Sequence, residues 1–557
     1  MGTGKRLAII YLVDGARPDV LRELIAAGEL PHIAREIASP GTFRTATSCL
    51  PSTTGPAHLP FLTGCFPGTL NIPGIRWLDK EVYRRSGVWN RLSFRSYNGI
   101  EALYMDRDLP VDRPTLFELT DRPRSIYSLI TRGLRGGQNL TRASKLFLYL
   151  YAHLTDNWHP VDRLAHRRLL ACLDDEPDFI FAVFPAVDSY SHLNHPRHDH
   201  TLAAYRHVDT SVGEIVAKLK RQGRWEETLF LITSDHGLTA TDQHFDLARF
   251  LDRRGIRTLY YPVVWKRRPR AAVMISGNAV GKIYFLDNAR GAGTSDDGGD
   301  DSGNSRGARS AGARGENGTD VDCSVARDGS ATFLTGDAVP AALGSLWDEL
   351  LGREEIDFLA WRAGGRSGAS EPDGAEQGVS RRDWEERSAS GRDGAEQGAS
   401  RRDRTTRARS WRISIAAARG RAEVECSPEG LRYCPLEGDP FGLGVIDRPL
   451  DRQAALEATV DSDYPDALVQ LEQFFGSPRS GDLLVVSRNG YDLRQAFEWP
   501  EHHSSHGSLH REHMMVPLIY NQTGWDDRAA RTVDVFNTVL KWLGKPEVGN
   551  ADGRALL

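Results

Sequence analysis

The sequence has little cysteine, no long hydrophobic run and almost no net charge. Its 557 residues include six cysteines, and none of them belongs to a C-x-x-C pair. This argues against a disulfide-stapled domain and against a cysteine zinc site. No run approaches the ~18 consecutive apolar residues of a membrane-spanning helix. The formal net charge is -5, so a protein that coats nucleic acid, which would be strongly basic, is not expected.

The apolar segment near the N-terminus is too short for a secretory signal. Lys5 and Arg6 precede an apolar run at residues 7–13, but the run ends at Asp14 without a small-residue cleavage site. We therefore predict that this run is a buried first strand and that the protein is cytoplasmic.

Strand-like and helix-like segments alternate in the two globular parts of the chain. Unbroken apolar runs, typical of parallel strands buried on both faces, are found at residues 7–13, 179–184 and 229–233, with a further strand candidate at 514–520. Helical periodicity is found at residues 20–37, 200–219 and 533–543. The alternation predicts an α/β fold with a mainly parallel sheet.

The middle of the chain differs in composition from both ends. Residues 290–330 and 364–410 are rich in Gly, Ser, Asp and Arg, and the second segment contains two copies of a polar 20-residue repeat. Such segments bury too little apolar surface to offset chain entropy, so we predict two disordered insertions. The expected division is a domain formed by residues 1–289 and 411–557, low-complexity insertions at 290–330 and 364–410, and a small folded segment of the same domain at 331–363.

Polar side chains follow three of the predicted strands at the point where each strand ends. Asp14 follows the first strand, Asp188 and His192 come just after the second, and Asp235 and His236 follow the third. Because ligands bind at the carboxyl ends of strands in open α/β sheets, we expect these groups to converge. Each pattern alone also has a structural explanation, since Asp-Gly pairs form turns and Asp often begins a helix.

A hydroxyl-rich loop and a histidine-rich segment could complete such a site. In Pro51-Ser-Thr-Thr-Gly-Pro-Ala-His58, a hydroxyl could cap the following helix or act as a nucleophile at its N-terminus. Five histidines lie between His502 and His513. One of them, with the aspartates and histidines at the strand ends, would form two sites of mixed nitrogen and oxygen ligands. Such ligands suit zinc, with manganese or iron as competitors.

In their order along the chain, these motifs resemble those of the alkaline phosphatase superfamily, most closely its type I phosphodiesterase/nucleotide pyrophosphatase family. The matching elements are Val13-Asp-Gly15, the block from Pro51 to Pro67, Asp188-Ser-Tyr-Ser-His192, Ser234-Asp-His-Gly237 and Ser505-His-Gly507. The resemblance covers residues 6–290 and the C-terminal segment of the chain. It implies an alkaline phosphatase-like three-layer sandwich, with a mainly parallel central sheet and helices on both faces.

The resemblance also assigns roles to particular residues. It implies that Thr54 is the catalytic nucleophile and forms a covalent phosphothreonine. It implies two divalent metal ions, with zinc as the first candidate and manganese or iron as alternatives. One ion would be held by Asp14, Thr54, Asp235 and His236, and the other by Asp188, His192 and His506, with His244 and His513 as alternatives to His506.

Two departures from the family pattern bear on the substrate. Gly55 follows Thr54 where the family has a phenylalanine that helps to stack a nucleobase. Ile75 stands near the position of a family asparagine that donates to the phosphoryl oxygen, and the neighbouring Arg76 could bind phosphate instead. An arginine there would favour a more highly charged substrate, so a phosphomonoester remains an alternative. An ordinary surface position is the other interpretation of Arg76.

The expected function is two-metal-dependent hydrolysis of phosphoric esters, with a phosphodiester or pyrophosphate bond preferred. Alternatives on the same scaffold are a phosphomonoesterase, a phosphonate hydrolase and a phosphoglycerate mutase-like enzyme. A non-catalytic binding protein is the alternative from another class. The expected partner is a small phosphorylated substrate, with no nucleic-acid partner and no membrane span. The sequence does not indicate the oligomeric state.

Overall fold

The computed structural model describes residues 6–90, 92–286, 338–363, 410–494 and 501–557. The insertions predicted at 290–330 and 364–410 lie outside these residues, apart from residue 410. The folded segment expected between them is described from residue 338 onward. Among the described helices, none combines the length and the hydrophobicity needed to cross a membrane.

A seven-stranded, mainly parallel sheet lies at the centre of the N-terminal part, in the order β21-β2-β20-β7-β1-β6-β5. Its strands are β1 (Leu7–Val13), β2 (Thr42–Thr47), β5 (Pro123–Ile126), β6 (Phe179–Phe184), β7 (Thr228–Thr233), β20 (Met515–Tyr520) and β21 (Ala530–Arg531). Strands β5, β6, β1 and β7 are parallel, whereas β20 is antiparallel to both of its neighbours. Every residue of β1 is at most 1% exposed, because the strand is paired on both edges and covered on both faces, as its unbroken apolar run predicts.

Aromatic side chains show that helices cover both faces of this sheet. On one face, Tyr11 stacks on Phe184, and its hydroxyl donates to Ser211 of α9 at 2.9 Å. Because side chains alternate along a strand, Phe181 points to the opposite face, where it packs near Phe61 of α2. The helices of this part are α1 (Pro18–Ala26), α2 (Leu59–Thr63), α4 (Met105–Asp108), α5 (Leu116–Leu119), α6 (Lys145–Thr155), α7 (His159–Cys172), α8 (Ala186–Leu193), α9 (Asp199–Arg221), α16 (Arg511–Met514) and α17 (Asp534–Trp542).

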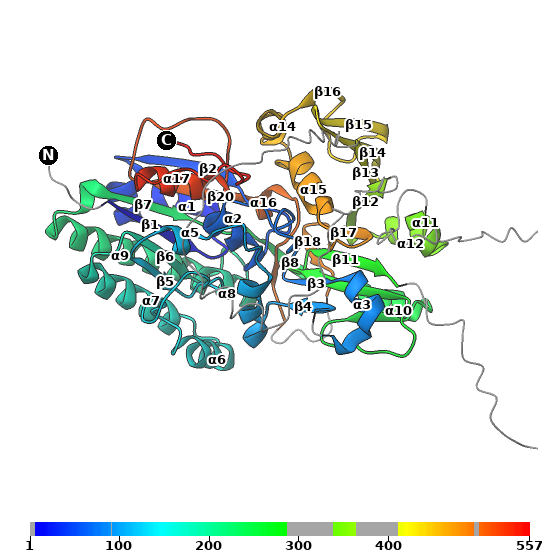
Figure 1. The fold of residues 1–557 in the computed structure, drawn as a ribbon, viewed down its shortest axis with the longest axis horizontal. Helices are drawn as coiled ribbons and strands as arrows, with labels where there is room; N and C mark the ends of the chain where they lie inside the picture. The colour runs from blue at the N-terminus through cyan, green and yellow to red at the C-terminus, as the bar shows by residue number, and fades with distance from the viewer. Residues whose placement is uncertain (1–5, 91, 287–337, 364–409, 495–500) are drawn as a thin grey trace, which may run out of the picture.

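A second, mostly antiparallel sheet of nine strands lies toward the other end of the molecule (Figure 1). Its strands are β9 (Thr258–Tyr260), β10 (Ala271–Ser276), β11 (Val280–Phe285), β12 (Ile356–Ala363), β13 (Trp411–Ala417), β14 (Gly420–Ser427), β15 (Gly430–Gly438), β16 (Ile446–Leu450) and β17 (Leu483–Ser487). It has a core of its own, in which Phe358, Val424 and Tyr433 pack with Phe474 of α15. The nearby helices are α3 (Lys80–Ser86), α10 (Leu247–Arg253), α11 (Ala338–Leu343), α12 (Leu346–Leu351), α14 (Arg452–Thr459) and α15 (Ala467–Gly476).

Two small sheets connect these parts. In the first, β8 (Thr239–His244) pairs with both β18 (Gly490–Asp492) and β19 (Ser504–Ser505). In the second, β3 (Arg76–Leu78) pairs with β4 (Phe94–Ser96) beside β10. Strand β8 follows β7 of the central sheet, and β18 follows β17 of the second sheet, so segments far apart in the chain meet between the two sheets.

The structure confirms most of the predicted elements and corrects one helix. The runs at 7–13, 179–184, 229–233 and 514–520 form β1, β6, β7 and β20, and the periodic segments at 200–219 and 533–543 form α9 and α17. The single helix predicted at 20–37 is wrong: α1 ends at Ala26, and a separate helical turn covers Ile33–Ala38. Gly28 adopts a left-handed φ of 75°, which ends the first helix, and Pro31 cannot continue it.

Phe181→Ala should test how far the core under the site depends on this aromatic layer. The side chain is fully buried, so we expect the free energy of unfolding to fall by about 3–5 kcal/mol in chemical denaturation. Phe147→Ala, at a phenylalanine that is 72% exposed, is the matched control and should change it by at most about 0.5 kcal/mol. Equal effects of the two substitutions would contradict the packing described here.

Candidate active site

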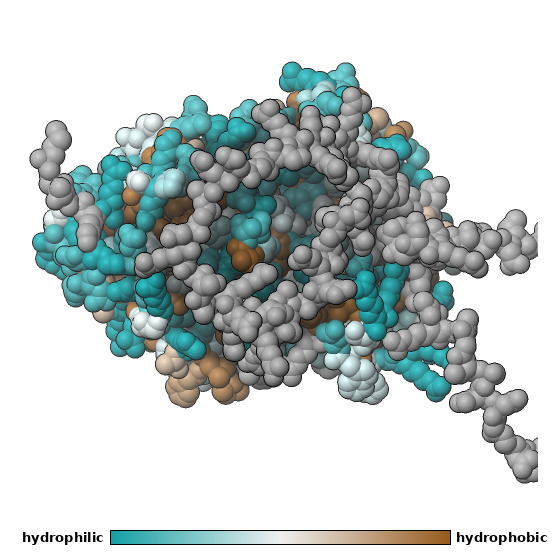
Figure 2. Space-filling model, in the orientation of Figure 1, coloured by the Kyte–Doolittle hydropathy of each residue, from teal (hydrophilic) through white to brown (hydrophobic). Residues whose placement is uncertain are grey.

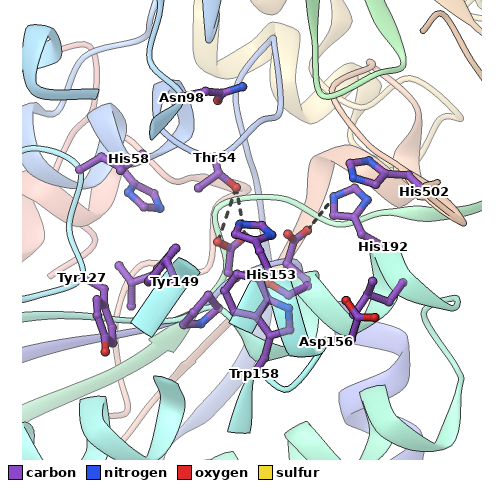
Figure 3. A pocket seen from close by; sticks show the side chains of 17 residues that line it. Thr54, His58, Asn98, Tyr127, Tyr149, His153, Asp156, Trp158, His192 and His502 are labelled. Atoms are coloured by element: carbon purple, nitrogen blue, oxygen red, sulfur yellow. Dashed lines mark hydrogen bonds and ion pairs between the residues drawn. The ribbon is translucent and has the colours of Figure 1, made fainter. Parts of the chain in front are cut away.

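Three neighbouring strands of the central sheet bring polar side chains together at one edge. Asp14 follows β1, Asp188 lies in α8 just after β6, and Asp235 and His236 follow β7. Strands β6, β1 and β7 are adjacent and parallel, so they end at the same edge of the sheet. Thr54, from the loop before α2, turns its hydroxyl toward this cluster (Figure 3).

The Thr54 hydroxyl contacts the cluster and does not cap a helix. It donates to Asp14 Oδ1 at 3.2 Å and lies 3.0 Å from His236 Nε2. The helical turn that follows begins after Gly55 and has no side-chain cap. Of the two interpretations of the hydroxyl-rich loop, capping therefore does not apply to Thr54.

Gly15 is required for the close approach of the first two strand ends. It has a φ of 69°, and a Cβ at this position would lie 2.9 Å from Asp188 Cβ. The Asp14-Gly15 pair is therefore both a turn and part of the site, because the turn brings the two aspartates together.

Three histidines of the cluster are oriented in the same way, by a hydrogen bond from Nδ1 to a backbone carbonyl. In His192, His236 and His506, Nδ1 lies 2.9, 3.1 and 2.9 Å from the carbonyl oxygens of Ser504, Gly237 and Ser52. With Nδ1 donating, the lone pair on Nε2 of each ring can bind a metal. Burial lowers the pKa of His192 to about 4, so this ring is neutral at pH 7, the form that ligates.

The residues present fit a metal-binding site. Side-chain ligand atoms lie within 4.8 Å of one another in two groups, Asp188 with His192 and His506, and Asp14 with Asp188 and His236. Asp188 Oδ1 and Asp235 Oδ2 are buried and accept no hydrogen bond within the described part of the chain. Buried carboxylate oxygens beside imidazole nitrogens are a donor set typical of zinc and similar cations.

The three carboxylates interact strongly in the protein without metal. Burial, with the neighbouring charges of Asp235 and Asp188, raises the pKa of Asp14 well above its ordinary value. Burial also raises the pKa of Asp188 to about 7. Burial alone would raise the pKa of Asp235 as well, but His236 and His58 hold that pKa below its ordinary value. Bound cations would favour the charged form of all three carboxylates.

A cavity of about 310 Å³ opens in front of Thr54 (Figure 3). Its floor carries the polar cluster, and one wall is aromatic, formed by Tyr127, Tyr149 and Trp158. The Tyr149 and Trp158 rings meet edge to face with centroids 5.4 Å apart. Asn98 lies on the same side of the cavity as Thr54. A charged floor and an apolar wall in a cavity of this size suit a small ligand that has a polar and an apolar part.

The structure does not bring Arg76 together with Thr54. Arg76 is buried, donates to the carbonyl oxygen of Ile275 at 3.3 Å, and lies 5.7 Å from the Tyr261 ring centre. It lines a separate, small cavity with Tyr260 and Tyr261. The prediction that Arg76 contacts the phosphate stays a prediction: Arg76 is not among the residues that line the Thr54 cavity, and β3 packs against β10 of the second sheet.

Of the three histidines considered for the last ligand position, the structure brings His506 to the cluster. Its backbone N–H donates to the Gly277 carbonyl at 2.9 Å, and it directly follows β19, which pairs with β8. His244 instead pairs with Asp492 at 2.8 Å, and His513 contacts Thr239 Oγ1 at 2.8 Å. The latter two histidines therefore help to hold the loops around the site.

Sequence reasoning missed several residues of the site. His58, buried behind Thr54, has its Nε2 3.5 Å from Asp235 Oδ2. His502 lines the cavity and packs on His192, with ring centres 4.4 Å apart. Asn98 and the aromatic wall come from segments that follow no predicted strand, so the sequence offers no signal for them. His58 stands in the loop motif and His502 is one of the five histidines at residues 502–513, so the sequence indicated both positions without assigning a role to either.

The family model for type I phosphodiesterase / nucleotide pyrophosphatase matches residues 8–295, which is about half of the chain. The chain belongs to this family. Its members are hydrolases that act on phosphoester bonds, and this protein is such a hydrolase. No curated protein sequence matches the chain.

Solved structures of low sequence identity share the fold. Phosphonoacetate hydrolase from Sinorhizobium meliloti 1021, in complex with phosphonoacetate, has a TM-score of 0.51 at 14% identity, over 97% of this chain and 96% of that chain. Murine ectonucleotide pyrophosphatase / phosphodiesterase 5 has a TM-score of 0.51 at 10% identity, over 98% of this chain and 96% of that chain. These likenesses confirm the predicted alkaline phosphatase-like α/β fold.

His506→Ala should lower the metal content of the purified protein. We expect affinity for zinc, measured by elemental analysis after dialysis against graded free zinc, to fall at least about tenfold, because a ligand atom is lost. His244→Ala is the matched control, since His244 is engaged with Asp492 outside the cluster. Equal metal content in the two variants would exclude His506 as a ligand.

Removal of metal should make stability depend on the ionisation of Asp188. Because folding raises the pKa of this carboxyl from 3.8 to about 7, the folded protein binds the proton more tightly than the unfolded chain. The resulting stabilisation should be complete below about pH 4 and lost as the pH rises to about 7. In metal-free protein, Asp188→Asn should flatten this part of a plot of Tm against pH. Parallel curves for wild type and variant would show that Asp188 is not the source of this pH-dependent stabilisation.

Proposed function

We propose that the protein hydrolyses phosphodiester or pyrophosphate bonds with two bound divalent cations and through a covalent phosphothreonine at Thr54. The observation that carries the proposal is the position of Thr54 Oγ1, 3.0 Å from His236 Nε2 and 3.2 Å from Asp14 Oδ1, on the floor of the cavity. A hydroxyl placed between a carboxylate and an imidazole at a ligand cavity is arranged as an activated nucleophile.

The polar cluster divides into two ligand sets. We assign one cation to Asp14, Thr54, Asp235 and His236, and the other to Asp188, His192 and His506. Zinc is the first candidate because the ligands mix imidazole nitrogen with carboxylate oxygen, and manganese or iron would accept the same set. When bound, the cations would lower the pKa of the threonine hydroxyl and compensate the charge of the phosphoryl oxygens.

The chain's own residues provide position and orientation. Asp14 Oδ1 accepts the hydrogen bond of the Thr54 hydroxyl and aligns the oxygen before attack. The Thr54 hydroxyl loses its proton to solvent, and its oxygen forms a bond to phosphorus while the bond from phosphorus to the leaving oxygen breaks. A water molecule then attacks phosphorus, the bond from phosphorus to the Thr54 oxygen breaks, and a proton from that water restores the hydroxyl. Because the histidines are anchored through Nδ1, the site needs little rearrangement between these steps.

The structural neighbours support chemistry at phosphorus. One is a phosphonoacetate hydrolase, and the other is a nucleotide pyrophosphatase / phosphodiesterase. An inactive threonine-to-alanine variant of the murine protein, in complex with AMP, matches this chain with a TM-score of 0.50 at 10% identity. In that protein, the variant that lacks a threonine hydroxyl is inactive, which agrees with the role proposed for Thr54.

The position of Arg76 supports a diester substrate over a monoester. A monoester carries an additional charge that a guanidinium in the cavity would neutralise. Arg76 lies in another cavity, beneath Tyr261, and the lining of the Thr54 cavity contains no arginine or lysine among the described residues.

Thr54→Ala should abolish hydrolysis of bis-p-nitrophenyl phosphate in the presence of zinc or manganese. We expect kcat to fall by about 10³-fold or more, because no other group replaces the nucleophile. Thr54→Ser keeps a hydroxyl and is the matched control that should retain measurable activity.

Parallel assays with p-nitrophenyl phosphate and phosphonoacetate identify the preferred bond. The proposal predicts that the diester is the best of the three. Full activity of Thr54→Ala would contradict the role of Thr54 as the nucleophile. A preference for the monoester or the phosphonate would contradict the proposed diester or pyrophosphate substrate.

A further inference from the structure

Helix α6 exposes a hydrophobic face to solvent. Its exposed apolar side chains are Leu146, Phe147, Leu150 and Leu154, with exposed fractions of 68%, 72%, 56% and 67%. Their spacing of three and four residues places them along one side of the helix. In Figure 2, hydrophobic residues gather at the lower edge of the molecule, where Figure 1 places α6. A contiguous apolar patch of this kind marks a binding surface.

The same helix forms part of the candidate active site. Tyr149 and His153, one turn apart, line the cavity in front of Thr54. The ring of Tyr149 lies 5.4 Å from those of Tyr127 and Trp158, so the aromatic wall extends from α6 into the cavity. A molecule that binds the exposed face of α6 is therefore next to the catalytic cluster.

Basic residues outnumber acidic ones in the sequence around α6, where Asp156, directly after the helix, is the nearest acidic residue. Between residues 131 and 155 the chain has four basic residues, Arg132, Arg135, Arg142 and Lys145, and no Asp or Glu, although the whole protein has a net charge of -5. Arg135 and Arg142 are exposed, whereas Arg132 pairs with Glu118. The Lys145 ammonium donates to the carbonyl oxygens of Tyr127 and Ser128 and fixes the start of the helix.

We propose that α6 docks on an anionic phospholipid surface and that the substrate is a phosphodiester with an apolar chain held in that surface. A helix that lies in a lipid interface needs a large apolar face and nearby basic residues, and α6 has both. The polar head of such a substrate fits the cavity of about 310 Å³, and its chain extends along the aromatic wall toward α6. The inference rests on the proposed phosphodiesterase function.

The proposal is tested by a charge introduced into the exposed face. The double substitution Leu150→Glu with Leu154→Glu changes two side chains that do not line the cavity. Leu436→Glu is the matched control, because Leu436 is 61% exposed on β15 of the second sheet. Each protein is sedimented with vesicles of phosphatidylcholine that contain phosphatidylglycerol. Wild type and control should bind, and the double variant should bind at least about tenfold more weakly.

Activity assays separate this inference from the function on which it rests. In the same vesicles, wild type should cleave p-nitrophenyl hexadecyl phosphate at least about tenfold faster than p-nitrophenyl ethyl phosphate, and the double variant should lose this preference. Hydrolysis of soluble bis-p-nitrophenyl phosphate without vesicles should be the same in all three proteins. If that hydrolysis is absent throughout, the proposed function fails, whatever the vesicles show.

Three results would overturn the docking proposal while the soluble diester is still cleaved. They are wild type that does not bind vesicles, a double variant that binds like the control, and wild type without a preference for the hexadecyl ester. The α6 face would instead contact a second copy of the chain if the wild type is a dimer in sedimentation velocity, the double variant is a monomer, and neither protein binds vesicles.

Discussion

The crowding of three carboxylates at the ends of β6, β1 and β7 is the constraint on which the rest of the site depends. Burial, together with repulsion from the neighbouring carboxylates, raises the pKa of Asp14 and of Asp188 in the absence of cations. The same parallel strands that make the core of the sheet continuous also force these side chains together. The arrangement is costly for an apolar fold and favourable for a protein that binds divalent cations there.

The chain completes this cluster from segments distant in sequence. His506 reaches it through β19, which pairs with β8, and through a backbone hydrogen bond to Gly277 before the second sheet's β11. Its ring donates to the Ser52 carbonyl in the loop that carries Thr54. The second sheet therefore helps to position the cluster, although none of the clustered side chains belongs to its strands. The polar cluster, the aromatic wall and the exposed face of α6 follow one another outward from the central sheet.

The central sheet and the groups at its strand ends could be predicted because each depends on local pattern. The unbroken run at 7–13 predicts β1, and Asp188 with His192 predicts a shared helix face, which α8 provides with the two side chains 3.4 Å apart. The rest depends on packing between distant segments. Nothing near Arg76 in the sequence reveals that β3 lies against β10. Strands β13–β16 of the second sheet are not followed by a polar motif of the kind that marks the strand ends of the central sheet. Asn98 and Tyr149 line the cavity because distant segments of the chain pack together there, which no local sequence pattern reveals.

The measurement that tests the central claim most directly is mass spectrometry of the protein after rapid acid quench during turnover of bis-p-nitrophenyl phosphate with zinc present. The account predicts a p-nitrophenyl phosphoryl group on the peptide from the loop before α2, with fragmentation placing it on Thr54. A modified Ser52 or Thr53, or an unmodified loop in a protein that is turning over substrate in a pre-steady-state burst, would contradict it.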